Sequence, residues 1–166
     1  GAARACSWWP LPLRLRFTWP PCSADMIRFG CAKGAAAVYR LICALEDAAF
    51  PRARFDQLYL AQCADERIFS LVWEEDGEVI GFANVRMEDQ LHHCARIAEI
   101  MELAVEEGCR GRGIGTVLFD RACALRAQAG CVQIELSCSC ARHDAHRFYA
   151  RKGMCLSHRR YIKTLK

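Results

Sequence analysis

The chain has 166 residues, enough for one domain with a substantial hydrophobic core. Apolar residues make up 53% and charged residues 25%, and no apolar run approaches the roughly 20 residues that span a bilayer, which argues against a membrane protein. The net charge of +4 is mild, and the scattered Lys and Arg residues argue against a nucleic-acid partner.

Twelve cysteines are many for this length, but no two have the Cys-x-x-Cys spacing of a zinc or redox motif. Several lie in apolar stretches, where a free thiol behaves as a small hydrophobic side chain: Cys43, Cys94, Cys123 and Cys131. We therefore expect reduced cysteines and a cytoplasmic protein.

Residues 1–25 differ in composition from the rest, because they contain four of the five prolines and three of the four tryptophans. Arg14, Arg16 and the prolines interrupt the apolar core of a secretory signal and oppose the amphipathic helix of a transit peptide. We expect residues 1–25 to be a disordered or artefactual leader and residues 26–166 to form the domain. A targeting role for the leader is the alternative.

From residue 26 onward, strand and helix patterns interleave. Residues 75–78, with the sequence Glu-Asp-Gly-Glu, predict a tight hairpin turn. Interleaved strands and helices with one hairpin indicate a mixed sheet covered by helices. The predicted strands are 26–29, 68–73, 79–85, 96–105, 132–137 and 161–165, and the predicted helices are 35–46, 51–63, 113–129 and 142–152.

A glycine-punctuated loop at 107–116 lies between a predicted strand and a predicted helix. Glycines let the backbone turn sharply and let an anion approach the amides, and the helix start adds unpaired N–H groups. The loop lacks the Gly-Lys-Ser/Thr ending of a Walker loop and the position of a Rossmann loop, and a basic surface turn is the alternative. The predicted diphosphate-binding residues are Arg110, Gly111, Arg112, Gly113, Ile114, Gly115 and Thr116.

Two motifs carry a resemblance to a known family. Residues 110–115, Arg-Gly-Arg-Gly-Ile-Gly, resemble the acetyl-CoA pyrophosphate loop of the GNAT superfamily, and residues 145–154 resemble its Ala-x-x-Phe-Tyr-x-x-x-Gly-Phe helix. Residues 37–46, 91–93, 99–103 and 142–149 are similar to the aminoalkylphosphonate N-acetyltransferases. The resemblance implies an α/β GNAT fold, with a mixed, mostly antiparallel twisted sheet of six to seven strands flanked by about four helices.

The same resemblance implies an N-acetyltransferase that moves an acetyl group from acetyl-CoA to the primary amine of a small aminoalkylphosphonate by direct attack. Alternatives are another small amine, such as an amino acid, a polyamine or an aminoglycoside, and a non-catalytic sensor that binds acetyl-CoA. A homodimer is implied by the superfamily only.

A proton acceptor and a proton donor can be assigned to two residues. Simple alternation places Glu99 among apolar neighbours on one strand face and Glu102 on the other, and the resemblance predicts a bulge that shifts this phase. The resemblance assigns the base role to Glu99, through a water, and the acid role to Tyr149, whose phenol stays protonated at neutral pH. It also places the backbone of Leu103 at the acetyl carbonyl and that of Val105 along the pantetheine arm.

Four histidines raise the question of a metal. Adjacent strand residues such as His92 and His93 point to opposite faces, so their spacing, with His143 and His146, does not support a metal site. The resemblance nevertheless implies that a divalent metal could assist phosphonate binding.

The acceptor pocket is expected between the first two helices and a loop at 86–94. A lining that includes Arg52, Arg54 or Arg86 would favour an anionic phosphonate, whereas an acidic lining would favour polyamines.

Overall fold

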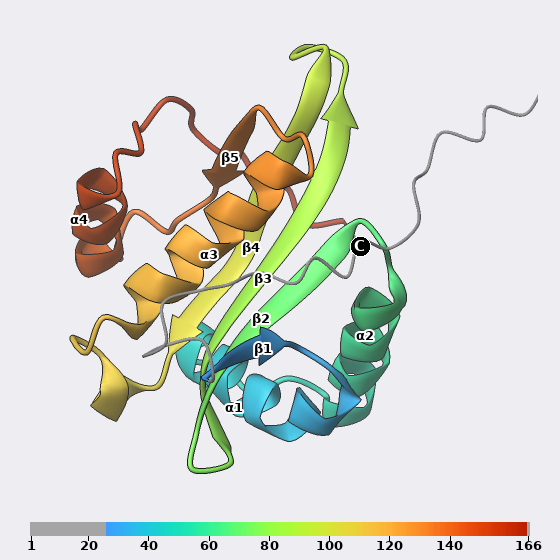
Figure 1. Ribbon diagram of the computed structural model, residues 1–166, viewed down its shortest axis with the longest axis vertical. Helices are drawn as coiled ribbons and strands as arrows, with labels where there is room; N and C mark the ends of the chain where they lie inside the picture. Colours follow the sequence, from blue (N-terminus) through green and yellow to red (C-terminus); the bar gives the residue numbers. More distant parts are fainter. Residues whose placement is uncertain (1–25, 166) are drawn as a thin grey trace, which may run out of the picture.

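The computed structural model describes residues 26–165, and the expectation about the leader at 1–25 lies outside them. Strands and helices alternate much as the sequence predicts, and Figure 1 shows their arrangement. The strands are β1 (Ile27–Phe29), β2 (Ile68–Glu75), β3 (Glu78–Gln90), β4 (Ala95–Val105) and β5 (Gln133–Leu136). The helices are η1 (Ala32–Gly34), α1 (Ala35–Glu46), α2 (Arg52–Ala64), η2 (Glu107–Cys109), α3 (Ile114–Gln128) and α4 (His143–Arg151).

A single five-stranded sheet, in the order β1-β2-β3-β4-β5, organises the described residues. Adjacent strands from β1 to β4 are antiparallel, and β5 is parallel to β4. The predicted hairpin turn is present between β2 and β3, where Asp76 and Gly77 have φ of 50° and 82°. Positive φ at both central residues is the backbone that joins two twisted strands without splaying them.

Two hydrophobic cores lie on opposite faces of the sheet, one under α1 and α2 and the other under α3 (Figure 1). The first core contains Val38, Leu41, Tyr59, Val72, Val79, Phe82 and Ala104. The second contains Leu71, Trp73, Ile80, Ala83, Val85, Ala98, Ile100, Ile114, Leu118, Phe119 and Ala122. Side chains of α4 pack against the second core, so α3 and α4 cover the same face.

The predicted bulge occurs in β4 at Met101. Asn84 of β3 pairs with Glu102 and the next residue of β3 pairs with Ile100, so Met101 is the extra residue. Before the bulge Ala98 and Ile100 pack toward α3, and after it Leu103 and Val105 do. An extra residue reverses the two-residue alternation, which brings Glu99 and Glu102 onto the α1–α2 face together.

Three expectations about the outer parts of the sheet are wrong. Residues 161–165 are not a strand: within residues 26–165 no strand pairs with them, and Tyr161 is 90% exposed. The described sheet therefore has five strands rather than six or seven. Most of the predicted loop at 86–94 belongs to β3, which leaves a short turn that exposes Cys94 instead of burying it.

The described cysteines are free thiols rather than disulfides. Within the same residues no helix is long and apolar enough to cross a membrane.

Candidate active site

The glycine-rich loop leads directly into the N-terminus of α3. Gly111 and Gly113 have φ of 80° and 86°, the left-handed region that favours glycine. Gly113 is the N-cap, and the amide of Val117 is the first to bond back to its carbonyl, at 3.1 Å. No side chain caps the helix, so the amides of Ile114, Gly115 and Thr116 remain available to an anion.

The two arginines of the loop are held by the protein. Arg112 Nη2 donates to both carboxylate oxygens of Glu75 at 2.8 Å, and Glu75 also accepts a bond from Trp73. The bond from Trp73, and after it the bond from Arg112, lower the pKa of Glu75. The bond to Glu75 in turn raises the pKa of Arg112. Arg110 Nε donates to the Val105 carbonyl at 3.3 Å. Through these hydrogen bonds the two arginines attach the loop to β2 and β4.

The side chain of Ile114, at the start of α3, is buried. The Ile114 side chain is 2% exposed and belongs to the core under α3. Its branched side chain packs the start of α3 against the sheet, so only its backbone amide is left for an anion at the helix start.

The C-terminal half of β4 has one open edge. The pairing of β5 with β4 covers only the four residues Ile97 to Ile100, and residues 101–105 have only β3 as a strand partner within residues 26–165. The backbone of Leu103 and Val105 therefore lies where an extended ligand could add alongside β4.

Two carboxylates lie on the same face of β4, in different surroundings. Glu99 Oε2 accepts a bond from Arg86 Nη2 at 2.6 Å, and Glu102 Oε2 accepts one from Asn84 Nδ2 at 2.9 Å. Burial raises the pKa of Glu102, the bond from Asn84 opposes this, and the charges of Glu46 and Glu99 add to the increase. Glu102 thus holds its negative charge less readily than an exposed glutamate.

A buried amide that the sequence prediction missed organises this region. Asn84 is 2% exposed, accepts a bond from Ser70 Oγ at 3.1 Å and donates to Gln62 Oε1 at 2.8 Å in addition to Glu102. The sequence does contain a signal for this role, since Asn84 is a lone polar residue inside the apolar stretch of β3. A polar side chain in such a position is buried only when it has hydrogen-bond partners.

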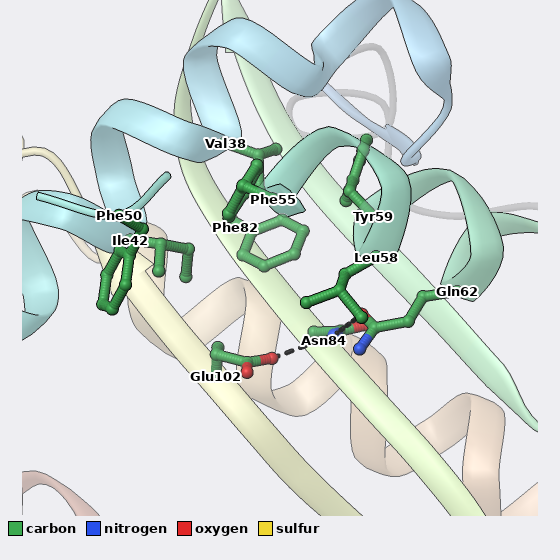
Figure 2. Close-up of a pocket in the computed structure, with 10 residues that line it drawn as sticks. All are labelled: Val38, Ile42, Phe50, Phe55, Leu58, Tyr59, Gln62, Phe82, Asn84 and Glu102. Atoms are coloured by element: carbon green, nitrogen blue, oxygen red, sulfur yellow. Dashed lines mark hydrogen bonds between the residues drawn. The ribbon is translucent and has the colours of Figure 1, made fainter. Parts of the chain in front are cut away.

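Gln62, Asn84 and Glu102 form one end of a pocket of about 200 Å³ between α1, α2, β3 and β4, and Glu99 is not among its lining residues (Figure 2). The remaining walls are apolar and aromatic. The lining residues are Val38, Ile42, Phe50, Phe55, Leu58, Tyr59, Gln62, Phe82, Asn84 and Glu102.

The pocket lies only partly where the sequence predicts it. The first two helices line it as expected, but no residue of the predicted loop at 86–94 does. None of the three candidate arginines lines it either. Arg52 binds Asp56 at 2.9 Å and lies over the Tyr39 ring, and Arg86 binds Glu99.

Tyr149 lies on α4 against the core under α3. Its ring contacts those of Phe148 and Phe119, with centroids 5.2 and 6.3 Å away. Burial raises the pKa of Tyr149 to about 12, with a smaller increase from Cys138 and an opposing effect of Arg142. The phenol therefore keeps its proton throughout the neutral range.

Arg142, just before α4, ties this helix to α1. Its Nη2 donates to the Leu45 carbonyl at 2.7 Å and to Glu46 Oε1 at 3.1 Å. The helix that carries Tyr149 is thereby fixed to the helix that borders the pocket.

The histidines do not form a metal site. His92 and His93 lie in the turn after β3 with ring centroids 4.3 Å apart, and His146 Nε2 is 3.0 Å from the Ser139 carbonyl oxygen. Among residues 26–165 there is no group of three His, Cys, Asp or Glu residues that could hold a metal ion. These residues do not fit a divalent metal.

Comparison with known proteins identifies the family. Residues 35–154 match the model of the acetyltransferase (GNAT) family. The chain belongs to this GNAT family. An aminoalkylphosphonate N-acetyltransferase of Salmonella typhimurium is 36% identical over 139 residues, which cover 84% of this chain and 90% of that protein.

Solved structures share the GNAT fold. A transcriptional regulator from Bacillus halodurans superposes with a TM-score of 0.78 at 20% identity, covering 84% of this chain and 98% of its own. An aminoglycoside acetyltransferase from a soil metagenome, solved with trehalose, gives 0.74 at 16% identity, with 86% and 99% covered.

Membership of the GNAT family makes the protein an acetyl-CoA-dependent N-acetyltransferase. Its residues fit this co-substrate in two respects. The uncapped first turn of α3, with left-handed glycines before it, suits a pyrophosphate. The open edge of β4 after the bulge suits an extended, amide-containing arm such as pantetheine.

Proposed function

We propose that this enzyme acetylates the primary amine of small aminoalkylphosphonates. The observation that carries the proposal is the 36% identity, over most of both chains, to the Salmonella aminoalkylphosphonate N-acetyltransferase. The resemblance noted in the sequence also includes 91–93 and 99–103, which lie in the turn before β4 and in β4 itself.

In the proposed reaction Glu99 removes a proton from the acceptor ammonium through a water. The free amine attacks the acetyl carbonyl, so that a C–N bond forms and the C–S bond breaks. Tyr149 donates its proton to the departing sulfur, and the attacking nitrogen then releases its second proton, which restores the Tyr149 phenol and leaves the neutral amide and the CoA thiol. Acetyl-CoA supplies the activated acetyl group, and the backbone at Leu103 polarises its carbonyl.

Binding of the co-substrate is assigned to the loop and to β4. The amides at 113–116 would hold the pyrophosphate, Arg110 and Arg112 would add positive charge, and Val105 would pair with the pantetheine arm. The supporting observations are the left-handed φ of Gly111 and Gly113 and the uncapped helix start.

The direct test is mass spectrometry of products after incubation with acetyl-CoA and a panel of amines. The panel contains aminomethylphosphonate, 1- and 2-aminoethylphosphonate, spermidine, amino acids and an aminoglycoside. Selective acetylation of the phosphonates is expected. Product from another amine only would refute the acceptor assignment, and tight acetyl-CoA binding without any product would establish a sensor instead.

No step of this mechanism passes through a metal, because the described histidines and acids do not form a ligand group. The panel is therefore run with and without a chelator, and equal rates are expected.

We also propose a cytoplasmic location, which the free thiols support. We further propose a homodimer, which the family resemblance alone supports and which light scattering checks.

Replacing Arg112 by alanine is expected to raise the KM for acetyl-CoA about tenfold and to lower kcat less than threefold. The change removes a positive charge beside the proposed pyrophosphate site and releases the loop from Glu75. Steady-state kinetics measures both constants. Arg159→Ala, the same charge change at an exposed position, is the control, and an equal effect there would contradict a local role.

Replacing Tyr149 by phenylalanine is expected to lower kcat by roughly 100-fold or more while the KM for acetyl-CoA stays within about twofold. The ring packing is preserved and only the proton donor is lost. Because the pKa of Tyr149 is raised to about 12, the phenol ionises only above the ordinary range, so the wild-type rate should not fall between pH 8 and 10 through Tyr149. An unchanged kcat in the variant would eliminate the assigned acid.

A further inference from the structure

The walls of the pocket in Figure 2 do not suit a phosphonate. Phe50, Phe55 and Phe82 contribute rings, and none of the lining residues, all of which lie within 26–165, is Arg, Lys or His. A phosphonate carries negative charge at neutral pH, and burying it against aromatic rings without a cation is costly. The space therefore suits an uncharged, apolar part of an acceptor.

The polar end of the pocket, formed by Gln62, Asn84 and Glu102, suits an ammonium group. Asn84 uses both Nδ2 hydrogens and its carbonyl oxygen in bonds to Gln62, Glu102 and Ser70, so it cannot turn without losing a partner. This fixes the Glu102 carboxylate through Oε2, while Oε1 makes no hydrogen bond to any residue in the described part of the chain. An oriented carboxylate with a free oxygen attracts a cationic amine.

The volume indicates the size of the group that the walls can enclose. The pocket measures about 200 Å³, and an apolar cavity of roughly 150 Å³ accommodates benzene. A single compact substituent fits, whereas a polyamine would place a second charge among the aromatic rings.

Resting on the proposed function, we propose that this pocket selects acceptors whose amine-bearing carbon carries a compact apolar group, up to the size of a benzyl group. The apolar group occupies the aromatic walls, Glu102 holds the ammonium, and Asn84 positions Glu102. The phosphonate of an aminoalkylphosphonate then remains outside the pocket.

The test uses two matched series of acceptors, with and without a phosphonate. The first comprises aminomethylphosphonate and its 1-methyl and 1-benzyl derivatives, and the second comprises methylamine, ethylamine and phenethylamine. Within each series kcat/KM is expected to rise about fourfold per buried methylene, and roughly 10- to 150-fold from the smallest member to the benzyl member.

The two proposals fail differently in this experiment. Product from the apolar amines but not from the phosphonates refutes the proposed function and supports the pocket. Product from the phosphonates with no increase along either series overturns the pocket. If no amine is acetylated, calorimetric titration of phenethylamine into the enzyme–CoA mixture decides, and absence of binding overturns the inference.

Two exposed leucines of α2 provide matched variants. Leu58 lines the pocket and Leu60 does not, and each is 47% exposed, so tryptophan at either position spares the core. Leu58→Trp fills the pocket and is expected to lower the benzyl-to-unsubstituted ratio of kcat/KM at least tenfold. Leu60→Trp should leave the ratio unchanged, and equal effects of the two would contradict the inference.

Glu102→Gln tests the cationic end. The KM for each accepted amine is expected to rise about 10- to 100-fold, the value of a hydrogen bond to a charged group, with kcat within about threefold. A fall in kcat at constant KM would place Glu102 in the chemistry and overturn its assigned role.

Discussion

Replacement of Glu99 by glutamine is expected to lower kcat for amine acetylation by roughly 100- to 10,000-fold and to leave the KM for acetyl-CoA within about twofold. Glutamine keeps the size of the side chain and can still accept a bond from Arg86 Nη2, which lies 2.6 Å from Glu99 Oε2. What it loses is the capacity to take a proton from the acceptor. The rate should recover at high pH, where part of the amine is already free.

Steady-state kinetics over pH 6–10 measures this effect. Glu106→Gln, on an exposed residue just after β4, removes one carboxylate that has no assigned role and serves as the control. A pH profile that keeps the wild-type shape in Glu99→Gln would show that another group takes the proton. The neighbouring Glu102→Gln is distinguished by its effect on the acceptor KM.

Replacement of Gly81 by alanine is expected to lower the free energy of unfolding by about 1–3 kcal/mol, measured by urea denaturation. A Cβ at Gly81 would lie 2.9 Å from Ile114 Cγ2, 3.0 Å from Leu118 Cδ1 and 3.1 Å from Trp73 Cβ. These contacts join β3 to the first turn of α3. The displaced helix start should also raise the KM for acetyl-CoA.

Gly115 provides a comparison within the same interface. Its added Cβ would lie 3.6 Å from Val105 Cγ2, an ordinary contact, and its φ is not positive. Gly115→Ala is therefore expected to be neutral or slightly stabilising, because alanine favours the helix. Equal destabilisation by the two changes would mean that close packing at Gly81 is not the cause.

The loop and the main elements could be predicted because their signals are local. Glycines at 111 and 113 permit the left-handed backbone that the loop adopts, and the Asp76–Gly77 turn and the apolar spacing in α1 depend on neighbouring residues only. The GNAT fold and family followed from two such motifs, and the family match confirmed them.

Features that depend on distant partners were harder to predict. Residues 161–165 have a strand-like pattern, but a strand needs a neighbour that the pattern does not specify. Alternation alone misplaces Glu102, because one extra residue at Met101 reverses it, and only the resemblance suggested that bulge. The bonds from Asn84 to Gln62 and Glu102 join three separate elements, so no local window contains them.

The two cores on opposite faces of the sheet also bear on how such an enzyme can diverge. Residues that line the proposed acceptor pocket belong mainly to the α1–α2 side, whereas the helix that follows the glycine-rich loop packs on the α3 side through Ile114 and Leu118. Substitutions on one side leave packing on the other largely intact, since distant sites act nearly additively. Acceptor preference can therefore drift by mutation during evolution while use of the acetyl donor is inherited unchanged.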